Sequence, residues 1–373
     1  MSIVRPSSVR SILFASALAL GCASSSPEAE PPPGPREDRA APSPSVVPRD
    51  GCVCGTEPGC PPCPAPSASS ASAAGPDKPP VETRGTFPPK DIAPPEERTK
   101  KPGDGAWAPL TVHRSKGADS PLYTTVLHPH KVRGDVVVQL VAIDLSRVSM
   151  DLVLGTDEPE GVSFPKEKKP GLVGPSAFDD LIAVTNGGFK KRHGGHGVGV
   201  MGETAVKPSP QFCTYAKTKG GKYLVGTYEK IAPDLADGFE WFRQTPPCLV
   251  ENGVKNPDTM NESKARRWGR AEDGKSEIRR SAVGFATDDR ILYFAIGDWV
   301  TPAWLSDALV AAGLQRAAEL DINWSYTRFI VYERAGTELV ATSPLLTELK
   351  APKREYVKEP SQRDFFTLRW KAK

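Results

Sequence analysis

The sequence predicts an α+β domain, a mixed β-sheet with few helices, preceded by a long disordered segment. Three observations support this prediction. Residues 23–105 hold about half of the chain's 39 prolines and almost no large apolar side chains. Residues 281–322 contain, in order, two apolar strands, one amphipathic helix and a short apolar strand. The sequence contains no visible repeat of about 20–50 residues, which argues against a solenoid or a propeller.

Residues 1–22 are typical of a cleaved export signal, because two arginines precede an apolar run too short to span a bilayer. The run ends in Ala-Leu-Gly-Cys, which resembles a bacterial lipobox. We therefore expect Cys22 to be lipidated and to anchor the protein to a membrane of the bacterial cell envelope. Ala23 does not match an inner-membrane retention signal, which favours the outer membrane. An ordinary signal peptide cut nearby is the alternative.

Residues 23–105 are expected to form a disordered tether, because they cannot bury enough apolar surface to offset the entropy of ordering. The tether carries a cysteine cluster that has two interpretations. C-x-C followed by C-x2-C fits a zinc site with four thiolates, whereas in an exported protein two small disulfides are the simpler interpretation. The four cysteines of the cluster are Cys52, Cys54, Cys60 and Cys63.

Residues 106–373 are long enough for one large domain. Two cysteines in this part, Cys213 and Cys248, are available to pair with each other. The net charge of +3 is nearly balanced, and the basic residues form no stripe with interleaved aromatic residues. Nucleic acid is therefore not an expected partner. The sequence indicates no cofactor, and it does not fix the oligomeric state.

The domain begins with two apolar segments, 135–145 and 148–156, which we expect to be paired strands. A third, 181–186, is a short apolar strand that runs directly into a glycine-rich loop. A fourth, 222–228, alternates as a half-buried strand does.

The clearest series of elements follows. Residues 281–298 read as two strands joined by a turn at two consecutive aspartates. Next, Thr301 is a suitable N-cap and Pro302 a suitable first helical residue, and apolar residues recur on one face until Gly313 ends the helix. Residues 317–322 form a further strand. Because a helix links strands in this series, we expect a mixed sheet.

The glycine-rich loop at 187–202 contains G-x-G-x-x-G, which alone would suggest a dinucleotide site. The context argues against it, because a segment with two prolines follows where a helix should begin. His193 and His196 form H-x2-H, half of a metal site, but no third ligand is evident and we predict no metal. A plain surface hairpin is the alternative.

Six motifs in order resemble the phosphodiester glycosidase family, over about residues 120–335. The motifs are TNGGF at 185–189, TPPCLVENG at 245–253, RSAVGF at 280–285, YFAIGD at 293–298, the helix that follows, and LD at 320–321. The resemblance implies hydrolysis of a sugar 1-phosphodiester. It also marks a departure: where the family has LDGGGS, this chain keeps Asp321 and Ser325 but has Ile322, Asn323 and Trp324 between them.

Hydrolysis of such a diester requires stabilisation of charge at the sugar carbon and at the departing phosphate, and carboxylates usually serve the carbon. Asp321 ends an apolar strand, where side chains reach a crevice. Asp298 ends another, and Glu319 lies on the same strand face as Asp321. We therefore predict these three as catalytic residues. The alternatives are that Asp321 caps a turn or pairs with an arginine, and that Asp298 is a turn residue.

The predicted substrate-binding residues are of three kinds. Glycine N–H groups and a guanidinium suit a phosphate, histidines suit a polar contact or proton transfer, and the loop after Asp321 offers a tryptophan face for a sugar. Structural roles in a turn or a surface ion pair are the alternatives for Asn186 and Arg280. The full set is Asn186, Gly187, Gly188, Arg280, His193, His196, Asn323, Trp324 and Ser325.

Three interpretations follow for the whole protein. The first is a lipid-anchored hydrolase that cleaves a sugar 1-phosphodiester in an envelope or extracellular glycan. The second is a glycan-binding lipoprotein without catalysis, because the altered loop removes the family's glycines. The third is a structural protein of the envelope in which tether and domain act as a spacer.

Overall fold

The computed structural model describes residues 86–115, 117–271, 273–345 and 355–372. The export signal, Cys22 and the cysteine cluster at 52–63 lie outside the described residues, so their roles stay predictions. No helix in the described part of the chain is both long and apolar enough to cross a membrane.

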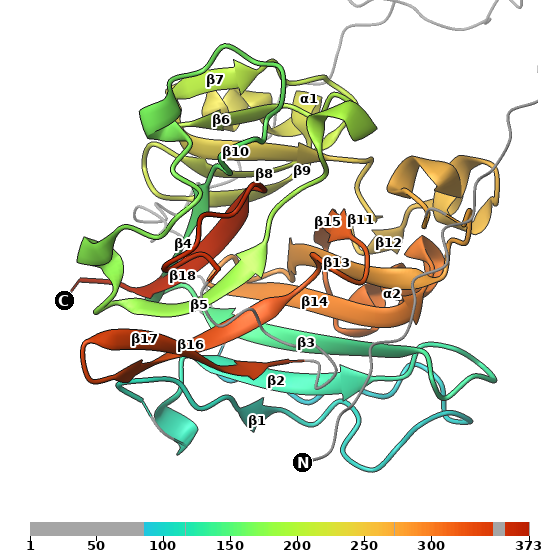
Figure 1. The fold of residues 1–373 in the computed structure, drawn as a ribbon. Coiled ribbons are helices and arrows are strands. Elements are labelled where there is room, and N and C mark those ends of the chain that lie inside the picture. The colour runs from blue at the N-terminus through green and yellow to red at the C-terminus, as the bar shows by residue number, and fades with distance from the viewer. Residues whose placement is uncertain (1–85, 116, 272, 346–354, 373) are drawn as a thin grey trace, which may run out of the picture. The chain divides into compact units, whose positions relative to one another are not determined.

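The described residues form three β-sheets (Figure 1), of which the largest has eight strands. Its order is β1-β2-β3-β14-β13-β15-β11-β12. The strands are β1 (Ala108–Pro109), β2 (Leu122–Leu127), β3 (Val137–Asp144), β11 (Val250–Glu251), β12 (Val254–Lys255), β13 (Ile278–Phe285), β14 (Ile291–Val300) and β15 (Arg316–Ile322).

The other two sheets have five strands each. One has the order β7-β6-β10-β8-β9, and the other β17-β16-β5-β18-β4. Their strands are β4 (Val148–Val153), β5 (Leu181–Asn186), β6 (Val198–Val200), β7 (Glu203–Val206), β8 (Cys213–Thr218), β9 (Tyr223–Thr227), β10 (Phe239–Thr245), β16 (Phe329–Ala335), β17 (Glu338–Pro344) and β18 (Phe365–Trp370).

Helices are few, as the sequence predicts. The α-helices of the described residues are α1 (Tyr228–Ile231) and α2 (Pro302–Ala311). Short 3-10 helices make up the rest: η1 (Gly117–Asp119), η2 (Lys166–Lys168), η3 (Pro175–Ala177), η4 (Lys191–His193), η5 (Ala232–Leu235), η6 (Pro257–Met260) and η7 (Lys264–Trp268).

The predicted series of hairpin, helix and strand is confirmed as β13, β14, α2 and β15. The side chain of Thr301 accepts a hydrogen bond from the Trp304 backbone N–H at 3.3 Å, which caps α2. Gly313 follows the helix with a φ of 79°, a conformation that glycine adopts without strain.

The prediction of a mixed sheet is wrong for the described strands, because every bonded pair of strands is antiparallel. The helix α2 does join two strands that run in the same direction, β14 and β15. However, β13 lies between them and bonds to both in the opposite direction. The expected pairing of segments 135–145 and 148–156 is also wrong, since β3 bonds to β2 and β14, whereas β4 bonds to β18 in another sheet.

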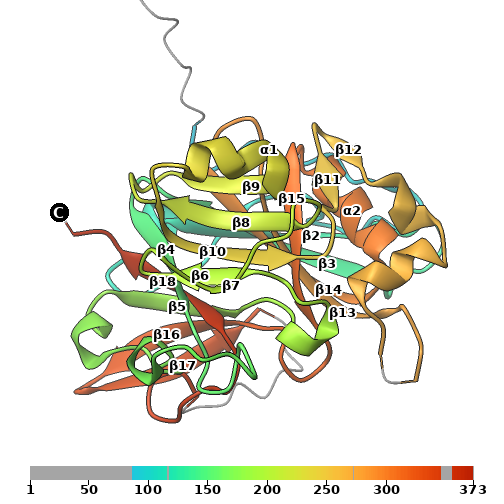
Figure 2. The same ribbon diagram turned by 90° about the horizontal axis from the view of Figure 1, so that it is seen from above.

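The three sheets share one hydrophobic core, to which each contributes aromatic or aliphatic side chains such as Phe294, Phe366 and Trp241. A second core lies on the other face of the eight-stranded sheet, where α2 packs with Leu305 and Leu309. Figure 1 shows the sheet of β6 to β10 above the strands β4, β18 and β5, with α2 to the side, and Figure 2 shows the same layers from above. The central sheet is therefore covered on both faces.

Described residues on the tether side of the predicted boundary at residue 106 pack on the domain. Phe87 makes an edge-to-face contact with Tyr123, with ring centroids 5.4 Å apart. Further along, Asp104 forms a buried pair with His128 at 2.8 Å. Residues 86–105 therefore pack on the domain through an aromatic side chain and a polar pair, even though their composition resembles that of the tether.

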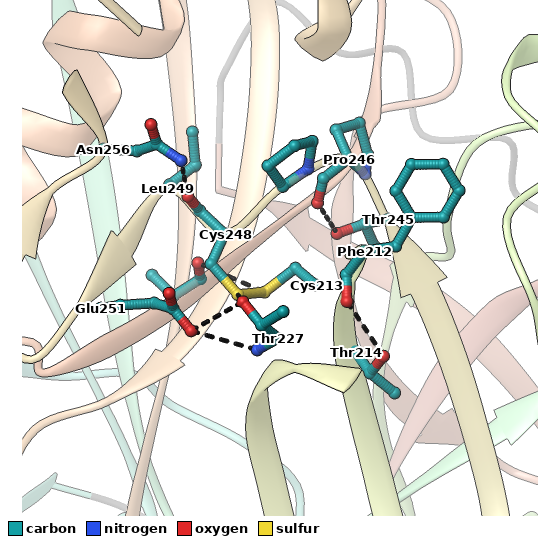
Figure 3. The surroundings of a disulfide bond; sticks show 12 residues. Phe212, Cys213, Thr214, Thr227, Thr245, Pro246, Cys248, Leu249, Glu251 and Asn256 are labelled. Carbon is teal, nitrogen blue, oxygen red and sulfur yellow. Dashed lines mark hydrogen bonds between the residues drawn. A yellow bond between two sulfur atoms is a disulfide. The ribbon is translucent and has the colours of Figure 1, made fainter. Parts of the chain in front are cut away.

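A disulfide joins Cys213 at the start of β8 to Cys248 just before β11 (Figure 3), which confirms the pairing that the sequence leaves open. It links the sheet of β6 to β10 with the central sheet. Beside it, the Thr227 hydroxyl donates to Glu251 at 2.8 Å, a second link between the same two sheets.

Candidate functional site

A cavity of about 810 Å³ opens at the end of β15. It lies among the loop after β5, the segment around η7 and the loop after β15. Five of the residues predicted from the sequence line it together: His193, Asp321, Asn323, Trp324 and Ser325.

Asp321 is the buried carboxylate of this cavity, with 5% of its surface exposed. Burial raises the pKa of Asp321 to about 7, although the neighbouring Arg363 favours the charged form and opposes the rise. The guanidinium of Arg363 donates directly to Asp321 Oδ2. The carboxyl group can therefore both hold and release a proton near neutral pH.

Arg363 is a site residue that the sequence analysis misses. It stands just before β18, far along the chain from the recognised motifs, and also donates to the Gly188 carbonyl at 3.3 Å. Its guanidinium carbon lies 4.8 Å from the ring centroid of Tyr326, which also lines the cavity. The only sequence signal is an arginine–aspartate pair directly before an aromatic strand.

Asn186 positions Asp321 from behind the cavity rather than lining it. Its side-chain amide donates to Ser281 Oγ at 2.8 Å and to the Asp321 carbonyl at 3.4 Å, and its carbonyl oxygen accepts from Arg328 N at 3.1 Å. Ser281 in turn donates to the Asp321 carbonyl at 3.0 Å. Asn186 thus ties together the ends of β5 and β15 and the start of β16, and all its polar atoms are used within the protein.

The glycines of the loop approach the protein's own chain, not an open site. Gly187 N–H donates to the Asp364 carbonyl at 3.0 Å, and Gly188 N–H to the Asp364 carboxylate at 3.1 Å. A Cβ at Gly187 would lie 2.4 Å from the Asp364 carbonyl oxygen, and one at Gly188 would lie 2.7 Å from Arg243 Nε. The expectation that these N–H groups face a phosphate is wrong, because Asp364 already accepts from both.

Arg280 and Glu319 form a fully buried pair that does not line the cavity, with 2.8 Å between Nη1 and Oε1. Arg280 also donates to four backbone carbonyls, including those of Trp268 and Gly269, and so holds the segment around η7 on the sheet. Burial raises the pKa of Glu319 to about 8, opposed by Arg280. Neither residue is placed to contact a substrate, which corrects both assignments.

Asp298 pairs with Arg279 through both carboxylate oxygens, at 2.5 and 3.0 Å, and does not line the cavity. The Arg279 guanidinium also donates to the Trp324 carbonyl at 3.4 Å. Asp298 is therefore one residue removed from the loop after β15, and its predicted catalytic role is not supported by its position.

The two histidines of H-x2-H have separate environments. His193 lines the cavity, and partial burial together with Arg192 lowers its pKa. His196 packs between Phe189 and Phe212 in the interior, where burial lowers its pKa to about 3. Within the described ranges no group of three histidine, cysteine or acidic residues is arranged to hold a metal ion.

The loop after β15 is held by Asn323, whose side-chain oxygen accepts from the N–H groups of Ser325 at 2.7 Å and Tyr326 at 3.0 Å. This turn, with a φ of 132° at Asn323, directs Trp324 to the cavity with 37% of its surface exposed. The residues between Asp321 and Ser325 thus build a compact turn with an exposed aromatic side chain.

The wall of the cavity has more cationic than anionic side chains, and three of its arginines also pair with carboxylates outside the lining: Arg192 with Glu160, Arg267 with Asp258 and Arg270 with Glu262. Six cationic side chains line it, against the two carboxylates Asp321 and Asp273. Within the described residues neither the Lys190 nor the Arg266 side chain forms a hydrogen bond or ion pair; Arg266 is exposed and Lys190 is half-buried. The six are Lys190, Arg192, Arg266, Arg267, Arg270 and Arg363.

No protein-family model matches the sequence, and no curated protein matches it. Among solved structures, the chain is similar to the catalytic domain of zebrafish N-acetylglucosamine-1-phosphodiester alpha-N-acetylglucosaminidase. The identity is 17%, the TM-score 0.43, and the match covers 72% of this chain and 96% of that one. It is also similar to a hypothetical protein from Synechocystis, with 12% identity, a TM-score of 0.40, and coverage of 72% and 69%. Both similarities are too distant to assign a family.

Proposed function

We propose that the cavity binds a sugar-phosphate diester and hydrolyses the bond between the sugar and the phosphate. The observation that carries this proposal is the buried Asp321, paired with Arg363, opening on a cavity with a basic wall. The arrangement offers cations for an anionic substrate next to one carboxyl group that can exchange a proton near neutral pH.

The charge of the wall favours an anionic substrate over a neutral sugar. Two other cavities of the described part each have three lysines or arginines balanced by three carboxylates. The cavity at Asp321 has six cations and two carboxylates. Several arginines around one cavity suit phosphate, because the planar guanidinium donates two parallel hydrogen bonds to it.

A single carboxylate suffices for this reaction. Glycosidases usually need a second carboxyl group to protonate the leaving oxygen. A phosphate monoester departs as a stable anion, so its oxygen needs nearby positive charge and not a proton. Neither Glu319 nor Asp298 lines the cavity, which is compatible with catalysis by Asp321 alone.

In the proposed step, Asp321 accepts a proton from a water molecule whose oxygen attacks the anomeric carbon. The bond from this carbon to the phosphate oxygen breaks, and the electron pair leaves with the phosphate. Lys190 and Arg266 neutralise the phosphate that departs, and Arg363 stabilises the ionised form of Asp321. The products are the free sugar and a phosphate monoester.

The test is turnover of α- and β-linked sugar 1-phosphate methyl diesters of glucose and N-acetylglucosamine by the purified chain. We expect Asp321→Asn to lower kcat by on the order of 10²-fold or more. The matched control is Asp273→Asn, which removes the other carboxylate of the same wall and should keep most of the activity. An inert wild type, or equal activity of wild type and Asp321→Asn, would refute the hydrolase.

A second candidate is a glycan-binding protein without catalysis. It is favoured by the turn at Asn323, which places an exposed tryptophan where the phosphodiester glycosidase motif has glycines. In that case the basic wall binds an anionic glycan, Lys190→Ala and Arg266→Ala weaken the binding, and no diester is cleaved.

We also propose that the protein acts outside the cytoplasm, attached to a membrane of the cell envelope by lipid at Cys22. The disulfide between Cys213 and Cys248 supports an oxidising compartment. The test is Cys22→Ala, which should move the protein from the membrane fraction to the soluble fraction. Retention of that variant in the membrane fraction would contradict the lipid anchor.

A further inference from the structure

Two exposed tryptophans lie side by side next to the cavity. Trp299 on β14 has 46% of its surface exposed and Trp324 has 37%. Their ring centroids are 4.7 Å apart, with an angle of 57° between the ring planes. The other large apolar side chains exposed in the described part are aliphatic: Val132, Met201, Val254 and Met260. An exposed pair of indoles is unusual on a protein surface and indicates a binding role.

The backbone holds Trp299 in an unfavourable conformation. Its φ is 57°, in the left-handed region that large side chains rarely adopt. The neighbouring loop also departs from ordinary geometry, with the φ of 132° at Asn323 before Trp324. Such conformations persist where the surrounding structure enforces them, and they are concentrated at functional sites.

Arg279 supports the ring of Trp324, the second member of the pair. Its guanidinium carbon lies 5.2 Å from the ring centroid of Trp324, and the Asp298 carboxylate pairs with the same guanidinium. Only 4% of the Arg279 side chain is exposed. Arg279, held by Asp298, therefore supports Trp324, which gives Asp298 a positioning role.

We propose that Trp299 and Trp324 form a platform that binds a second sugar ring of the substrate. This inference rests on the proposed function, because it extends the same site. Trp324 lines the cavity and also contacts Trp299, so a sugar on the platform is continuous with a sugar-phosphate in the cavity. The substrate is then a glycan with at least two sugars, not a monosaccharide with a small aglycone.

The chemistry of the platform suits a sugar. A pyranose ring has an apolar face of C–H groups and a rim of hydroxyls, and an indole offers a broad apolar surface with little conformational entropy to lose. The partly exposed Asp298 carboxylate lies one residue from Trp299, where it is available to hydroxyls. A rigid pair of rings supported from beneath by Arg279 is preorganised for such a ligand.

The experiment compares short and extended probes in the Asp321→Asn background, so that no probe is consumed. The short probes are the methyl diesters of glucose 1-phosphate and N-acetylglucosamine 1-phosphate. The extended probes carry one more sugar, either on the phosphate or on the first sugar. We expect one extended series to bind about tenfold more tightly than its short probe, a gain typical of one stacked ring.

The platform variant is Trp299→Gly, which should abolish this gain while short probes bind as before, because Trp299 does not line the cavity. Trp324→Ala should also abolish the gain, measured against the short-probe affinity of the same variant, because Trp324 lines the cavity. Glycine accepts the φ of Trp299, so that variant is expected to fold. Trp299→Phe should keep most of the gain, because it retains an aromatic face. The matched control is Met201→Gly, which removes another exposed apolar side chain at positive φ, 54°, that is not part of the cavity lining.

The proposal is overturned if no extended probe gains affinity, or if the gain survives both tryptophan variants. It is also overturned if the tryptophans are needed only for binding to phosphatidylglycerol vesicles, which would assign them to a membrane surface. Failure of the hydrolase is a separate result, because a tryptophan-dependent gain in binding does not require turnover.

Discussion

Asp321→Asn is expected to make the protein more stable at alkaline pH while it removes activity. In the folded protein burial raises the pKa of Asp321 from 3.8 to about 7. At about 1.4 kcal/mol for each tenfold change in acidity, the ionised carboxylate costs the folded state about 4 kcal/mol. Asparagine resembles the protonated form of the side chain, so the variant avoids this cost.

The direction in which stability changes with pH follows from the direction of the change in the pKa of Asp321. A carboxyl group whose pKa is higher in the folded state stabilises that state while it is protonated, below the pKa of the unfolded chain. This stability is lost as the pH rises toward the folded pKa, between about pH 4 and pH 7. The difference in stability between variant and wild type should therefore be near zero at about pH 4 and reach its maximum above about pH 7.

The assay is urea denaturation of both proteins at about pH 4, 6 and 8, with free energies of unfolding compared at each pH. Subtracting the wild type removes the contributions of other titrating groups. Asp273→Asn serves as the control, because Asp273 lies on the exposed rim and is paired with Lys275, which lowers its pKa. If Asp321→Asn is less stable than the wild type at about pH 8, the ion pair with Arg363 stabilises the folded state by more than burial of the carboxylate destabilises it, contrary to the prediction.

Three further predictions concern the pairs around the site and the disulfide. With Asp321 acting as a base, kcat/KM should rise as the pH increases through about 7. Arg363→Gln should move the midpoint of this rise by about one pH unit or more to alkaline values, so that activity returns at high pH. An unchanged midpoint would argue against the role of Arg363. Glu319→Gln should keep most of the turnover, because the pair of Glu319 with Arg280 lies outside the cavity. A loss of turnover comparable to that of Asp321→Asn would show that Glu319 takes part in the chemistry. Replacing both Cys213 and Cys248 by alanine removes the disulfide, whose two cysteines are 35 positions apart in the sequence, and should lower the free energy of unfolding by about 4 kcal/mol. The measurement compares the variant with the wild type, with and without reductant. Equal stabilities of the oxidised wild type and the variant would contradict this prediction.

The sequence predicts best what is encoded locally. The helix α2 is confirmed because its start depends on Thr301 and its end on Gly313, both within the segment itself. The pairing of strands is not local. In the sheet β13 lies between β14 and β15. The pattern of apolar residues within each segment predicts a strand, but it does not specify which strands become neighbours.

The same limit applies to the site. The position of Asp321 at the end of a strand is predictable, because it follows from the apolar run before it. Its partner Arg363 comes from a segment 42 positions away in the chain that no motif marks. The glycines at 187 and 188 indicate a close approach of the backbone, but only the structure shows that Asp364, and not a ligand, is what they approach.

The position of β18 in its sheet has a consequence for how the protein reaches its active form. This strand, the last one of the described chain, lies between β5 and β4, and Arg363 and Asp364 come directly before it. The sheet therefore remains open, and the Asp321 carboxylate lacks its contact with Arg363, until residues 363–370 have left the ribosome or the translocation channel. A chain that crosses a membrane unfolded, as its export signal predicts, would thus delay both folding and catalytic competence until this strand has crossed. Shortened chains that stop before residue 361 should accumulate as inactive, protease-sensitive species.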